Sequence, residues 1–305
     1  MNIHTMLPIF ALSLVLAACS DSTEPPLPTP IDQGAAVDTT RDSGPPAPDS
    51  TVDTVPPGIP ATVCAAIVEE GDVPRAGGNI QFCNVHVCLN GTFDEKGKVC
   101  VSVKDANGYL FHALFYDSGS KLYSDTFVPV EISQEDVTVG NTIDLGTLFA
   151  PQLAKTFALD ADKGASIDFG NGSSLTVPAN VAQLPIGVDT VEVGLVQVDK
   201  EMLHSRLLAS YPGGADPLNC TTPSACANPV ATFMIVPFDI SFSSKVAYSL
   251  ATDLPAATKL KMLWVNAETG ILEEVGAVEV GSGGVISGDS AKGLSHLGMY
   301  LFVAE

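Results

Sequence analysis

The sequence has little positive charge and few aromatic residues. Among its 305 residues are 14 Lys and Arg against 35 Asp and Glu, and the formal net charge at pH 7 is −21. Such an acidic chain is repelled by phosphate backbones, which argues against a nucleic-acid partner. Charged residues make up only 16% of the chain, and 27 residues are Gly. Together with frequent Val, Thr and Ser, this composition favours strands over helices and predicts an all-β fold.

The sequence also lacks the short motifs that carry much of hydrolytic and metal chemistry. HExxH, CxxC and GxSxG are absent, and the two weaker serine-hydrolase matches, at 118–121 and 288–290, have the wrong context. A calcium loop starting at Asp160 fails because Ala165 and Asn171 replace the required Gly and Glu. The five histidines lie far apart in the chain: His4, His86, His112, His204 and His296. We therefore predict a non-enzymatic protein with no cofactor and no metal.

Long apolar runs are missing as well. The longest, Leu7 to Ala18, is too short to cross a bilayer, which needs about 20 residues, but has the length of a signal-peptide core. The run closes on Leu16-Ala17-Ala18-Cys19, which resembles the lipobox of bacterial lipoproteins. The segment before it, 1–6, departs from the usual pattern because it contains no Lys or Arg. An ordinary cleaved signal peptide is the alternative interpretation.

The lipobox resemblance implies that Cys19 becomes the lipid-modified first residue of the mature protein. Stable anchoring takes more than one acyl chain, and the diacylglycerol and N-acyl groups of a lipoprotein meet that need. Ser20 stands where Asp often marks retention in the inner membrane, so the resemblance favours the outer membrane.

Residues 20–60 read as a tether. Ten of these 41 residues are Pro, none is aromatic, and seven acidic residues face one Arg. A segment of this composition cannot bury enough apolar surface to fold, so we expect a disordered linker rich in polyproline II. Fully extended, it would reach roughly 130 Å.

Six cysteines remain once Cys19 is set aside. An even number in an exported protein indicates disulfides, and the spacing lacks the CxxC pairs typical of zinc sites. Sequence alone does not fix the pairing. Proximity in the chain favours these pairs: Cys220 with Cys226, Cys83 with Cys88, and by remainder Cys64 with Cys100.

Residues 61–157 show short apolar runs separated by turn signals. Predicted strands cover 79–87, 99–103, 109–116 and 142–148, and Gly97 suits a tight turn over 93–98. Thr92 to Val99 and Asp144 to Leu148 resemble the hairpin and closing strand of the carboxypeptidase regulatory-like, transthyretin-type β-sandwich. That resemblance implies a non-catalytic module.

Residues 158–305 form a second β pattern. We expect strands near 174–177, 188–198, 246–250, 259–265, 273–280, 285–286 and 294–303, and a short helix after Asp199. Leu175 to Ala179, Pro237 to Phe242 and the segment 294–300 resemble parts of ZU5- or GAIN-like sandwiches. Autoproteolytic members of such folds need a hydroxyl nucleophile after His-Leu. Gly298 supplies none, so we predict no self-cleavage and a structural role for His296.

Aromatic residues provide few candidates for ligand contacts. Trp264, the only Trp, shares strand parity with Leu260 and Met262 and is expected in the core. Sugar binding would then depend on Tyr109, Tyr116 or Tyr123.

The sequence thus predicts two tandem antiparallel β-sandwiches, at 61–157 and 158–305, after a signal peptide (1–18) and a linker (19–60). We expect a non-catalytic, lipid-anchored envelope protein for surface display, adhesion or scaffolding. The alternative is a module that binds glycans or cell-wall polymer. The expected partners are the membrane, through the anchor, and a surface protein or glycan.

Overall fold

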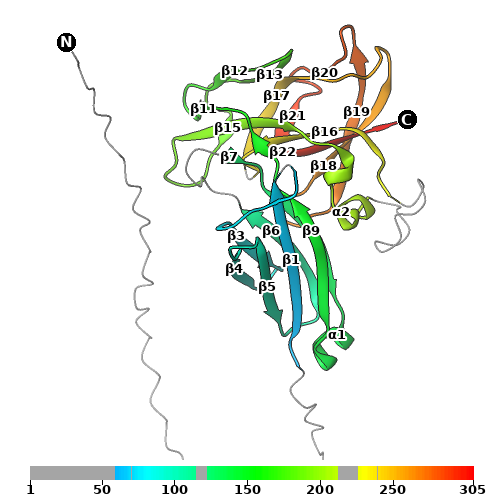
Figure 1. Cartoon of the computed structure of the whole chain (residues 1–305). Helices are drawn as coiled ribbons and strands as arrows, with labels where there is room; N and C mark the ends of the chain where they lie inside the picture. Colours follow the sequence, from blue (N-terminus) through cyan, green and yellow to red (C-terminus); the bar gives the residue numbers. More distant parts are fainter. Residues whose placement is uncertain (1–58, 70, 115–121, 212–225, 239) are drawn as a thin grey trace, which may run out of the picture. The chain divides into compact units, whose positions relative to one another are not determined.

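A computed structural model describes residues 59–69, 71–114, 122–211, 226–238 and 240–305, and almost all of its regular structure is β (Figure 1). Residues 1–58, which include the predicted signal peptide, Cys19 and most of the predicted linker, lie outside the described residues. The all-β prediction is confirmed, and the strands form two sandwiches joined by a shared apolar layer. In the described part of the chain, no helix has the length and apolar character needed to cross a bilayer.

The first sandwich packs two sheets face to face. One contains β5 (Lys98–Val103), β1 (Ala61–Glu69) and β9 (Thr142–Phe149), with the short β2 (Val73–Pro74) paired to β1. The other has the order β4 (Cys88–Thr92), β3 (Asn79–Cys83), β6 (Asn107–Leu114) and β8 (Thr126–Ile132). Alternate residues of β1 and β5 are buried, as the period of a strand requires. Their side chains meet those of the facing sheet in one core.

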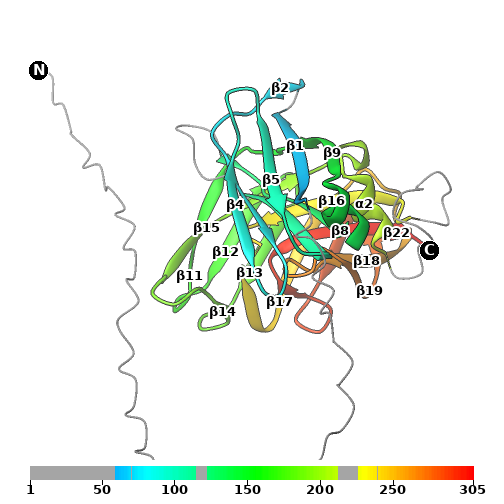
Figure 2. The same ribbon diagram turned by 90° about the horizontal axis from the view of Figure 1, so that it is seen from below.

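One pair departs from the antiparallel expectation, because β1 and β9 run parallel. Their register extends from Thr62 opposite Thr142 to Val68 opposite Phe149. The two strands lie side by side in both views of the ribbon (Figures 1 and 2). Helix α1 (Gln134–Val139) starts at a capping box on Ser133 and ends at Gly140, which has a φ of 75°. The helix therefore returns the chain to the end of the sandwich where β1 also begins.

The tight turn before β5 forms as predicted. The Asp94 carboxylate accepts hydrogen bonds from the backbone N–H groups of Lys96 and Lys98, both at 2.8 Å. Gly97 has a φ of 69°, and a Cβ there would lie 2.5 Å from the carbonyl oxygen of Ile67. This position therefore requires glycine.

Disulfides join neighbouring strands of the first sandwich. Cys64 and Cys100 are directly opposite each other on β1 and β5. Their bond closes a loop of 36 residues and stabilises the fold by about 3.8 kcal/mol in the chain-entropy model. Cys83 and Cys88 close the β3–β4 hairpin. Cys226 is also disulfide-bonded, and Cys220 lies outside the described residues.

The β3–β4 hairpin corrects the predicted strand 79–87. That strand ends at Cys83, since the side chain of Asn84 accepts hydrogen bonds from the backbone N–H groups of His86 and Val87 and turns the chain. Asn commonly forms such local turns in competition with a β ladder.

The strands of the second sandwich form one continuous hydrogen-bonded sheet, which folds over into two layers. Its strand order is β11 (Thr156–Asp160), β15 (Thr190–Gln197), β16 (Pro229–Val236), β22 (Gly298–Ala304), β18 (Lys259–Val265), β19 (Leu272–Gly281), β20 (Val285–Gly288), β17 (Ser241–Ala251), β13 (Ser173–Val177) and β12 (Ala165–Gly170). Two short strands, β14 (Ala182–Gln183) and β21 (Leu294–His296), also pair with β17. Buried side chains of both layers form a second core between them.

Short elements connect the two sandwiches. β7 (Leu122–Tyr123) pairs with β10 (Gln152–Leu153) just before the chain enters β11. The predicted helix after Asp199 exists as two pieces, η1 (Lys200–Met202) and α2 (Ser205–Ala209), and the side chain that caps α2 is His204. The predicted domain boundary after residue 157 stays a prediction, since residues 54–305 form one compact unit.

A third apolar cluster, the junction core, fills the space between the sandwiches. Leu110 and Phe127 of the first sandwich pack in it with Phe238 and Leu263 of the second. The rings of Phe127 and Phe238 meet edge to face with centroids 4.8 Å apart. This contact fixes the walls of the cleft described next.

Candidate functional site

A cleft of about 900 Å³ lies beside the junction core and has walls from both sandwiches. Gln81, His112 and Asp125 line it from the first sandwich. The second sandwich contributes side chains from β18, from the β18–β19 turn, from β21, from the start of β17 and from the segment before it: Phe238, Ser241, Trp264, Asn266, Glu268 and His296. Residues from distant parts of the sequence thus share one cavity.

Strand register places the polar residues of the first wall. Gln81 of β3 is directly opposite His112 of β6, which is in turn opposite Phe127 of β8. The imidazole of His112 stacks on the Phe127 ring at 4.1 Å, and its Nε2 lies 3.1 Å from an Asp125 carboxylate oxygen. The wall thus holds an amide and a histidine–carboxylate pair above the apolar junction.

Trp264 dominates the second wall. Its indole stacks on the His296 ring with centroids 4.5 Å apart and an interplanar angle of 16°. We predicted a core position for Trp264, and the side chain does pack against the core of the second sandwich. It is only partly buried, however, because β18 delivers it at the margin of that core, where it also lines the cleft.

Gly298 permits this position of Trp264. A Cβ at Gly298 would lie 2.7 Å from the indole Nε1, and its φ of 149° is one that residues with side chains rarely adopt. Nε1 itself is buried and makes no hydrogen bond within the described structure. The indole therefore packs against the bare backbone of Gly298.

Burial shifts the protonation of His296. Desolvation lowers its pKa below the usual 6.5, and Glu273 opposes that shift. His296 is therefore neutral at pH 7, and its Nδ1 lies 3.0 Å from the Ser295 hydroxyl. The neutral imidazole covers one face of the indole, so this part of the second wall is uncharged.

Among the described residues that line the cleft, no serine, histidine and carboxylate are linked by hydrogen bonds into a hydrolytic triad. Ser241, the hydroxyl that lines the cleft, donates to the amide oxygen of Gln183 at 2.7 Å. Ser295 contacts His296 but does not line the cavity. The hydroxyl that lines the cleft is therefore held by an amide and not by a general base.

Comparisons with known proteins give distant likenesses only. No protein-family model matches the chain, and no curated protein matches it. The distant matches among solved structures are bacterial proteins, pilins among them. They include the Bacillus anthracis TIE protein (9% identity, TM-score 0.27), a streptococcal ancillary pilin (11%, 0.22) and BcpA, the major pilin subunit of Bacillus cereus (11%, 0.26).

The alignments cover 81%, 82% and 80% of this chain and 45%, 53% and 88% of those proteins, respectively. The chain therefore spans about half the length of the first two. At such TM-scores the likeness carries no argument about this protein.

Two of the three tyrosines predicted as possible sugar contacts, Tyr109 and Tyr123, are not available for that role. Tyr109 is buried and stacks on Phe82 at 4.6 Å, and its hydroxyl donates to the carbonyl oxygen of Asp105. Tyr123 is buried beneath the guanidinium of Arg75, which lies 3.6 Å from the ring centroid. Both predictions were wrong because these rings face the core, and Tyr116 lies outside the described residues.

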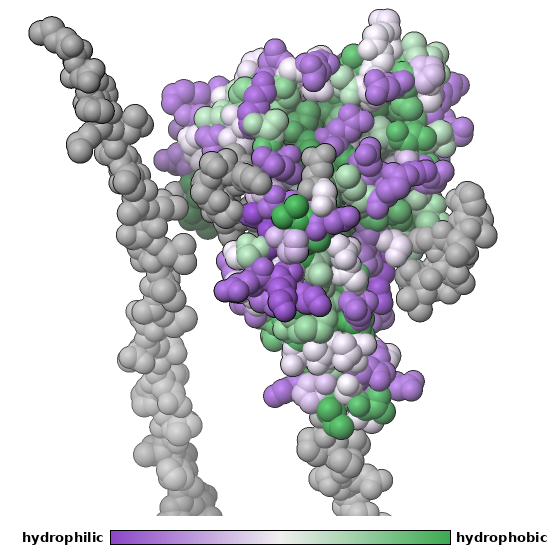
Figure 3. Space-filling view, viewed as in Figure 1, coloured by the Kyte–Doolittle hydropathy of each residue, from purple (hydrophilic) through white to green (hydrophobic). Residues whose placement is uncertain are grey.

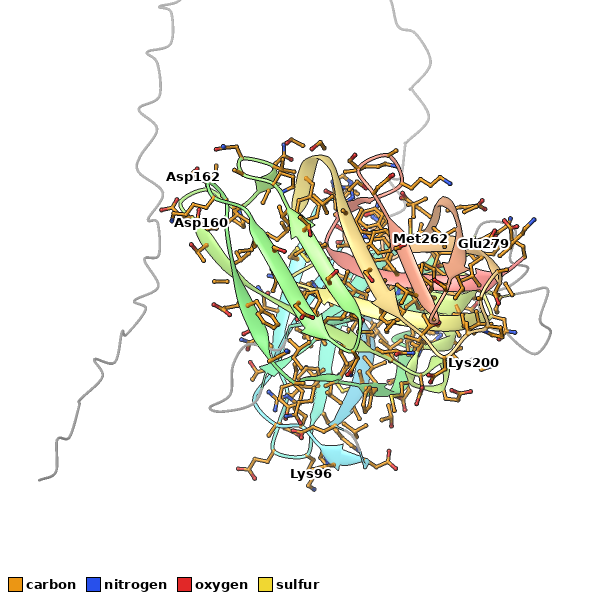
Figure 4. All side chains as sticks on the ribbon, turned by 90° about the horizontal axis from the view of Figure 1, so that it is seen from above. Lys96, Asp160, Asp162, Lys200, Met262 and Glu279 are labelled. Carbon is orange, nitrogen blue, oxygen red and sulfur yellow. A yellow bond between two sulfur atoms is a disulfide. The ribbon has the colours of Figure 1, made fainter. Side chains whose placement is uncertain are left out.

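Other candidate motifs occupy turns. The Asp160 carboxylate accepts hydrogen bonds from the backbone of Asp162 and Lys163 and pairs with the Lys163 ammonium in the β11–β12 turn (Figure 4). Asp289 similarly accepts from the backbone of Ala291 and Lys292. The described residues contain no group of three or more side chains suited to hold a metal ion. The motif at 118–121 lies outside them.

Proposed function

We propose that this protein is a non-catalytic, lipid-anchored component of a bacterial envelope that displays its second sandwich away from the membrane for adhesion or scaffolding. Lipidation at Cys19 holds it, and the Pro-rich segment 20–60 acts as the tether. The outer membrane is the favoured location. The observation that carries the proposal is the position of the start of β1.

The parallel β1–β9 pair supports this orientation. The start of β1 lies beside the start of β9, where the N–H of Thr62 donates to the carbonyl oxygen of Asn141 at 2.9 Å. The far end of β9, at Phe149, leads into β10 and the second sandwich. With a rise of about 3.3 Å per residue, the strands separate the tether from the junction by roughly 25 Å. The first sandwich therefore acts as a spacer.

The exposed side chains of the described residues support a display role. In the described structure, the large apolar side chains that are exposed are aliphatic or Met, and none is aromatic. Figure 3 shows apolar colour at the lower tip of the first sandwich. Ile59 forms a β-bridge with Val139, and both side chains are exposed. Because the described surface has no cluster of aromatic residues, a display role is better supported than ligand binding on an exposed face of either sandwich.

Anchoring is tested on protein isolated from membranes of its host. We expect an intact mass equal to residues 19–305 plus the lipid, less the hydrogens lost in disulfides, and no product cut between Leu297 and Gly298. A Cys19→Ala variant should leave the membrane fraction, while an Asp21→Ala variant should stay in it. A lipid-free mass, or membrane retention of Cys19→Ala, would contradict the anchor.

Display is tested separately on intact cells. An antibody against the second sandwich should label cells that carry the native protein and should fail on cells that express Cys19→Ala. Labelling only after the cells are broken would contradict display while leaving the anchor intact.

A further inference from the structure

We propose that the cleft between the two sandwiches binds an uncharged oligosaccharide, with Trp264 as the surface on which a sugar ring stacks. The inference goes beyond display, and it depends on the proposed function only for where the ligand is encountered. It replaces the buried tyrosines with a site built from both sandwiches.

The apolar part of the cleft is suited to the face of a sugar ring. Trp264 supplies a flat aromatic side chain, and Phe238 lies next to it, 3.5 Å from where a Cβ of Gly298 would stand. Stacking with His296 and contact with Gly298 hold the indole in one orientation. A fixed aromatic side chain loses little conformational entropy when a ligand binds, so the wall is preorganised.

The polar part of the cleft matches ring hydroxyls, which both donate and accept hydrogen bonds. Gln81 and Asn266 offer amides, and Asp125 and Glu268 offer carboxylate acceptors. The Asn266 amide already donates to Glu273 at 2.8 Å, and its side-chain oxygen accepts from the backbone of Glu268. These bonds fix the β18–β19 turn that carries Glu268 at the rim.

Electrostatics selects an uncharged ligand. Neither Lys nor Arg is present among the described residues that line the cleft, whereas Asp125 and Glu268 are. His296 is neutral at pH 7, and the chain as a whole carries a net charge of −21. Uronic acids, sialic acids and phosphorylated sugars would meet repulsion from these carboxylates.

The size of the cleft favours an oligomer over a single sugar. At about 900 Å³ it lies near the upper end of the range of small-molecule sites, about 300–1,000 Å³. Its polar groups stand on opposite sandwiches, and a chain of several sugars would contact both walls.

The chain contains its own reporter, because Trp264 is its only Trp. We would titrate the full-length protein, solubilised in detergent, with maltopentaose, cellopentaose, laminaripentaose and chitopentaose, and follow Trp264 emission and heat. We expect saturable binding of at least one of these neutral probes at micromolar to millimolar concentration. An acidic pentagalacturonate should not bind.

Variants assign the binding to the cleft. Gln81→Ala should raise Kd about tenfold, because it removes one hydrogen-bonding group from the first wall. Trp264→Leu should abolish binding measured by heat. The matched control is Gln134→Ala, an exposed amide on α1 outside the cleft, which should bind like the native protein.

Three outcomes would overturn the proposal: no binding by any neutral probe, unchanged binding in both cleft variants, or equal binding of pentagalacturonate. Because the titration is done in detergent solution, its outcome does not depend on lipidation or display. Failure of the cleft proposal is thereby distinguishable from failure of the proposed function.

Discussion

At the scale of single residues, the contact between Gly298 and Trp264 is the most demanding in the structure. A side chain at 298 would have to displace the indole, and the backbone there has a φ of 149°. We expect Gly298→Ser to lower the free energy of unfolding by about 1–3 kcal/mol, because overpacking and backbone strain add. Chemical denaturation followed by Trp264 fluorescence measures the change.

The added hydroxyl should not introduce self-cleavage, because the clash moves it away from the Leu297 carbonyl. Gly276→Ser is the matched control, since a Cβ there meets nothing within 4 Å and its φ is ordinary. Native-like stability of Gly298→Ser, or two fragments on a denaturing gel, would show that Gly298 does not constrain this site.

Single residues were also where sequence reasoning was least reliable. Alternation correctly put Trp264 on the same side as Leu260 and Met262, but it could not show that the core ends there. It gave no sign that Tyr109 and Tyr123 face inward. His112 and Asp125 carry no motif, since only the pairing of β6 with β8 and the packing of the junction bring them to the cleft.

At the scale of elements, α2 is coupled to β9 through His204. One ring nitrogen, Nε2, lies 3.0 Å from the carbonyl oxygen of Leu145, and the other, Nδ1, accepts the backbone N–H of Arg206 at 3.1 Å. Both contacts are satisfied by the neutral ring with its proton on Nε2. Burial, and to a smaller degree the charge of Arg206, lower the pKa of His204 below 6.5, while the Leu145 hydrogen bond opposes this shift.

This predicts that acid weakens the contact between α2 and the first sandwich. The unfolded chain takes up the His204 proton at a higher pH than the folded one, so stability falls as pH drops below about 6.5 and levels off below the folded pKa. The thermal midpoint measured from about pH 7 down to about pH 5 should decline less steeply in His204→Asn.

Asn at this position can still cap α2 but does not titrate. His86→Asn, at an exposed residue, is the control and should keep the native slope. If the thermal midpoint falls equally steeply with pH in His204→Asn and in the native protein, His204 is not the group responsible. His296 contributes in the same direction, because burial also lowers its pKa.

Strands in which apolar and polar residues alternate, and turns with a characteristic Gly or Asp, were predictable from the sequence. Strands buried on both faces were not. β18 and the turn at Gly97 match the expectation. β16 was missed because almost every residue in it is buried: Phe233 and Ile235 face the second core, and Met234 and Val236 face the junction core. A continuous apolar run of this kind has no period to read.

At the scale of the whole molecule, the fold class follows from composition, whereas the cleft does not. The cleft requires Gln81 and His112 to meet Trp264 and His296, which are far away in the sequence. Only the junction core fixes that meeting. The parallel pairing of β1 with β9 is equally invisible in the sequence, because any strand with apolar alternation could have filled either place.

That parallel pair decides how the molecule bears a mechanical load. A pull between the tether and the second sandwich draws the start of β1 away from the end of β9, so the hydrogen bonds of the ladder are sheared together. A pull from Asp72, just past the end of β1, would open the same ladder one bond at a time. In single-molecule stretching, the first sandwich should therefore rupture at a higher force from the N-terminus than from a handle at Asp72.

The Cys64–Cys100 bond sets how far the chain extends once it yields. The bond holds 36 residues out of the stretched length, so a reductant should add roughly 120 Å to the rupture step. Equal rupture forces in the two geometries would show that the ladder does not bear the load. With the display and the cleft ligand proposed above, such a fold would keep the cleft intact while flow pulls on the cell.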